Sequence, residues 1–205
     1  KPLPTLKPDA IFSMENIPFE VSQVMWPEIG QGGAVRLTTE VMPATADAAA
    51  AEKWEAFARD AAEAAPARSF LVDISDGSAE EAAYVMKRTA VTLRSAAADA
   101  KVGISAAGRD AAWLQAFFAL DVSPYVDFVS VGGAEDIAPM RALLDKADPK
   151  SEIWLEGQHA SDANAALRTV LKAAREGANA VVFSELGREA LPALGRALDL
   201  MRGYA

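Results

Sequence analysis

Cysteine is absent from this chain of 205 residues, and histidine occurs once, as His159. Without thiols the chain forms no disulfide and offers neither a thiolate nucleophile nor a thiolate ligand. A zinc site would have to be built from one imidazole and carboxylates. We therefore expect no metal and no other cofactor. The lack of cysteine is compatible with the periplasm and with the cytoplasm.

The sequence also lacks a long apolar run and an excess of basic residues. Its longest hydrophobic stretches are short and interrupted, so we expect no membrane insertion. The formal net charge of -9 argues against a nucleic-acid partner, which needs a basic face, and against adhesion to anionic membranes. The proline-rich residues 1–9, an extended lead-in without an initiator methionine, indicate a processed periplasmic or secreted protein or a fragment of a longer chain.

Three common catalytic signatures are missing. The chain contains neither the GxGxxG fingerprint nor the GxxxxGK[ST] loop, so a nucleotide site has little support. It also lacks the GxSxG turn that carries the nucleophile of α/β-hydrolases. Any chemistry must therefore come from other side chains.

What the chain does contain is a regular alternation of β-branched and alanine-rich stretches. Strands are predicted at residues 10–16, 34–41, 69–74, 101–105, 126–131, 152–156 and 179–185. Helices are predicted at about 44–65, 78–98, 111–120, 136–147, 161–177 and 189–201, and residues 17–33, broken by prolines and glycines, are predicted to be irregular. Strand followed by helix throughout predicts one α/β domain over residues 1–205 with about seven parallel strands. Both a doubly wound sheet and an incomplete TIM-barrel-like fold fit this order.

Acidic residues collect where the predicted strands end. The stretch 69–77 carries Asp73 and Asp76 and stops at Gly77, and a capping box of Ser78 and Glu81 follows. Other predicted strands end near Glu15, Glu40, Glu156 and Glu185. Because such ends converge at one mouth of a barrel, these carboxylates could act together on a glycosidic bond. The alternative is that each caps the helix that follows.

Five further residues follow or lie within predicted strands. Trp154 lies in the middle of a strand, which predicts a core position, with stacking on a sugar ring as the alternative. Gln158 and His159 follow that strand, and His159 either meets substrate or caps the next helix at the surface. The pair Gly132-Gly133 would let backbone amides approach an anion.

Several segments occur in an order that is typical of one enzyme group. They are Trp54-Glu55-Ala56-Phe57, the strand 70–76, Tyr84, Lys101-Val102-Gly103, the segment 126–132 (VDFVSVG), Ile153-Trp154-Leu155-Glu156-Gly157 and the last strand, 180–183. Together they resemble the catalytic half of clan A glycoside hydrolases, which are retaining (β/α)8 barrels that include xylosidase- and exopolysaccharide-hydrolase-like families. The resemblance covers roughly residues 34–190.

The resemblance implies Asp76 as acid/base and Glu156 as nucleophile. Beside these two, the positions in and after the predicted strands make Glu40, Asp73, Trp154, Gln158, His159 and Glu185 the candidate substrate-binding set. Three positions depart from the pattern: Ser75-Asp76 replaces Asn-Glu, Gly132 replaces a histidine, and the nucleophile motif is one residue shorter.

Two hypotheses follow from this pattern. One is a glycoside hydrolase-like domain that hydrolyses a bacterial polysaccharide or, as a pseudoenzyme, only binds it. The other is a non-catalytic barrel that contacts proteins or itself in a larger secreted or envelope assembly. A doubly wound small-molecule enzyme is a third possibility, which the missing phosphate loop disfavours.

Overall fold

The computed structural model describes residues 19–24, 34–39, 48–64, 69–74 and 77–186. One seven-stranded sheet runs through them in the order β1-β2-β3-β4-β5-β6-β7. Its strands are β1 (Phe19–Val24), β2 (Ala34–Thr39), β3 (Ser69–Ile74), β4 (Lys101–Ser105), β5 (Phe128–Val131), β6 (Glu152–Ala160) and β7 (Ala180–Leu186). Strands β2 to β7 are parallel, whereas β1 pairs antiparallel with β2.

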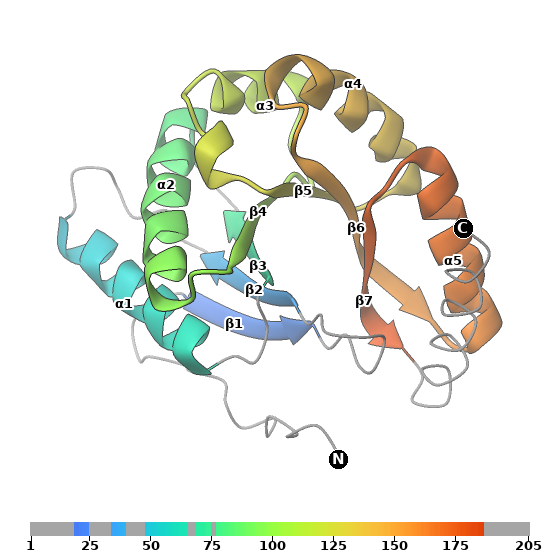
Figure 1. Cartoon of the computed structure of the whole chain (residues 1–205), viewed down its shortest axis with the longest axis horizontal. Helices are drawn as coiled ribbons and strands as arrows, with labels where there is room; N and C mark the ends of the chain where they lie inside the picture. Colours follow the sequence, from blue (N-terminus) through green and yellow to red (C-terminus); the bar gives the residue numbers. More distant parts are fainter. Residues whose placement is uncertain (1–18, 25–33, 40–47, 65–68, 75–76, 187–205) are drawn as a thin grey trace.

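Helices connect the parallel strands and cover the outside of the sheet. They are α1 (Ala48–Ala64), α2 (Ala79–Ala96), α3 (Ala111–Phe118), α4 (Ile137–Ala147) and α5 (Ala163–Glu176), with short 3-10 turns at Ser123–Tyr125 and Ala134–Asp136. Figure 1 shows the sheet curled, with the helices on its convex side. The edge strands β1 and β7 approach within 8 Å at some Cα atoms, but no hydrogen-bonded pairing between them occurs in the described residues. The fold is therefore an α/β open barrel.

This architecture confirms the predicted alternation of parallel strands and helices and corrects the predicted strand count. Six strands are parallel, not seven, because β1 arises within the segment 17–33 that was predicted to be irregular. The first four residues of β1 (FEVS in FEVSQV) alternate apolar and polar side chains, a short strand pattern that the flanking prolines and glycines obscured. The predicted strand 10–16 and helix 189–201 lie outside the described residues.

The two faces of the sheet carry different cores. The face toward the helices holds most of the buried apolar side chains, among them Phe70, Val102 and Ile153, none of which has measurable exposure. The concave inner face holds a smaller cluster of Leu71, Phe128, Trp154 and Val182. Because successive strand residues point to opposite faces, this division follows directly from the sequence.

The inner cluster is tightly packed around one glycine. The rings of Phe128 and Trp154 stack with their centroids 3.8 Å apart. Gly103 on β4 pairs in register with Phe128, and a Cβ there would stand 2.5 Å from Phe128 Cζ and closer still to two other ring carbons. Gly103 is therefore required by the close approach of an aromatic ring.

Helix ends follow local signals that the sequence displays. Ser78 and Glu81 form the predicted capping box at the start of α2. Gly177 ends α5 in the left-handed conformation, at φ 96°, as the glycine after a helix typically does. These ends fix where each helix starts and stops against the sheet.

Candidate functional site

Five neighbouring strands place a group of polar side chains on the inner face of the sheet. We call it the Arg36 cluster, and its members are Arg36 on β2, Asp73 on β3, Ser105 on β4, Ser130 on β5 and Glu156 on β6. Four of the five stand two positions after an inner-face neighbour: Leu71, Gly103, Phe128 or Trp154. The period-two alternation of strands therefore carries them to the same face, one layer closer to the mouth.

Glu156 is the centre of this cluster. Its residue is 3% exposed, and the Oγ atoms of Ser105 and Ser130 each donate a hydrogen bond of 2.6 Å to its Oε1. Its Oε2 forms an ion pair with Nη2 of Arg36. A carboxylate oxygen accepts hydrogen bonds, and the two serine hydroxyls satisfy Oε1. Oε2 has no hydrogen-bond partner among the described residues and is held by the ion pair with Arg36 alone.

Arg36 joins two carboxylates. While Nη2 pairs with Glu156, Nη1 lies 3.4 Å from Oδ2 of Asp73. The Nε atom of Arg36 is buried and has no hydrogen-bond partner in the described part of the chain. The cluster thus holds two negative charges and one positive charge around a single guanidinium. Burying such charges is costly unless they are paired, so each member depends on the others.

A β-bulge directly after Glu156 shapes the end of β6. Gly157 has φ 70°, and the register between β6 and β7 shifts on either side of Gln158. The bulge lets β6 continue to Ala160, four residues past its predicted end. Bulges of this kind redirect side chains and are frequent beside active sites.

Gln158 and His159 take different positions at this bulge. The Nε2 group of Gln158 donates to the carbonyl oxygens of Glu156 (2.8 Å) and Gly132 (3.0 Å), which ties β6 to the loop after β5. Both amide hydrogens of Gln158 are therefore engaged by backbone. His159 is exposed, and its backbone pairs in register with Glu185 of β7.

The structure brings together only some of the residues predicted from sequence. Asp73 and Glu156 meet on Arg36, and Trp154 lies in the apolar layer beneath them with 9% exposure, as its mid-strand position predicted. Glu40 and Asp76 lie outside the described residues, as does the side chain of Glu185. Glu15 also lies outside the described residues.

Sequence reasoning missed Arg36, Ser105 and Ser130. The signal for Arg36 was a charge inside the otherwise apolar and β-branched stretch AVRLTT, in phase with the inner face. The serines carried a weaker signal, since each stands among buried apolar residues near the end of its strand.

Acidic residues surround the mouth in the loops that follow β4, β5 and β6. Asp110 caps α3 by accepting from Trp113 N (2.7 Å), and Asp162 caps α5 by accepting from Ala165 N (2.9 Å). The hydrogen bond from the Ala165 backbone is the main cause that lowers the pKa of Asp162. Asp136 accepts from Gly133 N at 3.2 Å. These acids play the capping role that was the alternative for strand-end carboxylates.

Glu152 occupies the opposite, amino-terminal end of β6. Burial raises the pKa of this carboxyl, but hydrogen bonds from Lys101 and Trp154 outweigh it, and the pKa lies below its ordinary value. The Lys101 Nζ to Glu152 Oε1 distance is 2.8 Å. Strand β6 therefore carries two paired glutamates, Glu152 at its amino-terminal end and Glu156 in its middle.

Two hollows lie on the helix side of β4 and β5. The first, of about 450 Å³, is at the carboxyl ends of these strands and is lined partly by Arg109, Gly132 and Asp136. The guanidinium of Arg109 lies 4.4 Å from the centroid of the Trp113 ring and donates to Ile74 O.

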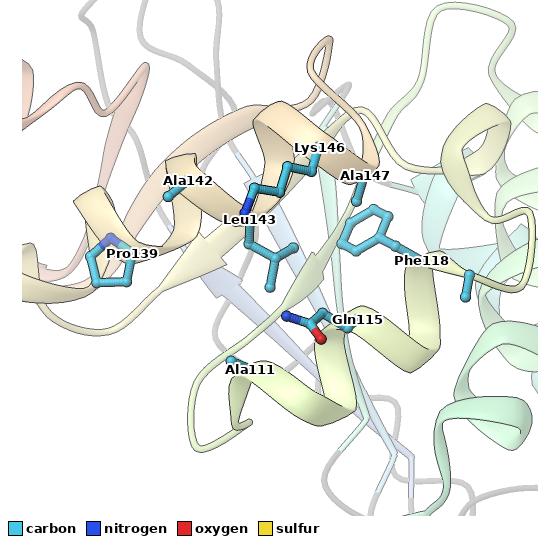
Figure 2. Close-up of a pocket in the computed structure, with 9 residues that line it drawn as sticks. Ala111, Gln115, Phe118, Pro139, Ala142, Leu143, Lys146 and Ala147 are labelled. Atoms are coloured by element: carbon cyan, nitrogen blue, oxygen red, sulfur yellow. The ribbon is translucent and has the colours of Figure 1, made fainter.

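The second hollow, of about 500 Å³, lies between α3 and α4. Figure 2 shows Phe118 and Leu143 lining it from the two helices, together with Gln115 and Lys146. Its remaining lining is mostly alanine and proline, so it is an apolar groove with a polar rim.

Two further observations limit what the described residues can do. They contain no group of three or more histidine, aspartate or glutamate side chains placed to hold a metal ion. None of their helices combines the length and the apolar character needed to cross a membrane.

Comparison of the chain with protein-family models, curated proteins and solved structures gave no match.

Proposed function

We propose that this chain is a glycoside hydrolase-like, TIM-barrel-related domain that binds a polysaccharide at the Arg36 cluster. The observation that carries the proposal is the joining of Asp73 and Glu156 through one arginine on the inner face, beside the carboxyl-terminal parts of β3 and β4. In barrels of alternating strands and helices, ligands bind at this end. Carboxylates and hydroxyls in a fixed arrangement are suited to the hydroxyl groups of a sugar.

The test is binding of the full chain to a panel of soluble bacterial polysaccharides by affinity gel electrophoresis. We expect at least one polysaccharide to retard the protein in proportion to its concentration in the gel. Retardation must also disappear when an excess of short oligosaccharides of the same sugar is added. If no member of the panel retards the protein, the proposal is wrong.

A second candidate function, retaining hydrolysis, is favoured by the pairing around Glu156. The ion pair with Arg36 and the two serine hydroxyls suit a carboxylate that stays charged, as a nucleophile must. Asp76 would then be the acid/base, as the resemblance implies. The assay is release of reducing ends from the polysaccharides that bind. Asp76→Asn should lower that release by about 10²–10⁴-fold if Asp76 transfers the proton, and unchanged release would exclude this role.

The competing candidate is a domain for protein contacts, favoured by the apolar groove between α3 and α4 and by the open sheet. Neither is needed for a sugar site at the inner face. Sedimentation equilibrium measures whether the protein self-associates and whether Leu143→Asp abolishes that association. If it does, and if the protein binds no polysaccharide of the panel, this candidate is favoured over the glycan site.

A further inference from the structure

The Arg36 cluster carries an excess of negative charge. Asp73 and Glu156 both pair with Arg36, which leaves two carboxylates for one guanidinium. Glu156 is nearly fully buried and the Asp73 side chain is 27% exposed, so solvent screens the excess charge only in part. The cluster therefore favours ligands that bring no further negative charge.

The loops that follow β4, β5 and β6, which we call the rim, also carry more negative than positive charge. The loops after β4, β5 and β6 contribute four exposed acids: Asp110, Glu135, Asp136 and Asp162. Arg109 is the one arginine or lysine in the described residues of these three loops. Its guanidinium lies over Trp113 and donates to Ile74 O. The exposed charged side chains of these three loops are therefore mainly carboxylates.

Arg36 is also poorly placed to receive an acidic ligand. If it turned to pair with a ligand carboxylate, it would have to leave Glu156, and a buried carboxylate without its cation is strongly unfavourable. An acidic sugar would therefore gain one ion pair only by breaking another.

We propose that the Arg36 cluster selects glycans whose sugar units are uncharged or carry an amine, and that it rejects acidic glycans. This inference rests on the proposed function, because it concerns the ligand of the same site. Selection arises from repulsion of the wrong ligand as much as from attraction of the right one.

The test compares two forms of one polysaccharide. A neutral polymer that retards the protein is oxidised at its primary hydroxyls to carboxylates, so that backbone and linkage stay the same. At low salt we expect the oxidised polymer to bind at least about tenfold more weakly, which corresponds to about 1.4 kcal/mol. Equal or tighter binding of the oxidised polymer overturns the charge selection alone. Failure of every polymer to bind overturns the proposed function and this inference with it.

Variants separate the charge of the site from the charge of the whole protein. Asp73→Asn removes one negative charge from the cluster, and Asp145→Asn removes one from the exposed surface of α4. We expect Asp73→Asn to restore much of the binding to the oxidised polymer, and Asp145→Asn to leave the tenfold difference in place. Equal effects would mean that overall charge causes the difference and would overturn the inference. Glu135→Gln, an exposed rim change, replaces Asp73→Asn if circular dichroism shows that variant to be unfolded.

Discussion

Replacing Arg36 by methionine should destabilise the protein by about 3 kcal/mol, the low end of the usual cost of breaking a buried ion pair. Glu156 would keep its two serine donors but lose its cation while remaining 3% exposed. The low end applies because the side chain of Arg36 is itself 29% exposed, so some water can reach the gap. The pair with Asp73 adds little, since both side chains are more than a quarter exposed.

Urea unfolding followed by tryptophan fluorescence measures this change. For a protein of this length, about 3 kcal/mol corresponds to a fall in melting temperature of about 6–12 °C. Arg175→Met is the matched control, because the Arg175 side chain is 78% exposed and forms an ion pair with its neighbour Glu176. That control should stay within about 0.5 kcal/mol of the wild type.

A double variant checks the cause of the loss. Arg36→Met combined with Glu156→Gln removes the uncompensated buried charge and should recover part of the stability that Arg36→Met loses. The reasoning would be refuted if Arg36→Met matched the exposed control, or if the double variant were less stable than the single one.

Three further predictions concern packing, a buried hydrogen bond and a helix cap. Gly103→Ala should cost about 1–3 kcal/mol by overpacking, whereas Gly132→Ala, where a Cβ meets nothing within 4 Å, should be nearly neutral in the same urea titration. Thr89→Val should cost about 1–3 kcal/mol, because Trp54 Nε1 donates to Thr89 Oγ1 at 2.6 Å in the core and would lose its acceptor. The pKa of Asp162 is lower in the folded protein than in the unfolded one, so its stabilising effect is present above the unfolded pKa and is lost as the pH falls through the folded pKa. Asp162→Asn should therefore reduce the fall in unfolding free energy at acidic pH.

Each of these has a contrary result. Equal stability of the two glycine variants would mean that the ring over Gly103 can move aside. A Thr89→Val variant as stable as the wild type would mean that Trp54 finds another acceptor. An unchanged acid limb in Asp162→Asn would remove the cap as a source of pH dependence.

Much of the fold could be predicted because local signals are strong. The β-branched stretches predicted strands at the positions of β2 to β7. The capping box at Ser78 and the glycine at position 177 predicted one helix start and one helix end, and the structure confirms both. Strand β1 was missed because the prolines and glycines around it predict irregular structure. Its strand conformation depends on pairing with β2, which the sequence of the segment does not show. Long-range pairing is not encoded in any single stretch.

The site could be predicted only in part. The position of Asp73 and Glu156 near strand ends indicated that they would converge, and they do so on Arg36. No motif assigned a role to Arg36 or to the two serines, and only the three-dimensional arrangement of the strands shows that they meet at Glu156. The bulge at Gly157 was also hidden, because a single glycine in a strand is compatible with several backbone conformations.

The central claim is that the carboxyl end of the inner face, rather than the inner face in general, binds the glycan. The most direct measurement compares Glu156→Gln, in the middle of β6, with Glu152→Gln, at the amino-terminal end of the same strand. Both variants are run in affinity electrophoresis against the polysaccharide that retards the wild type best. Glu156→Gln should lose binding at least about tenfold, a change of about 1.4 kcal/mol, while Glu152→Gln keeps it and both remain folded by circular dichroism. Retained binding in Glu156→Gln, or an equal loss in the two variants, would contradict the account.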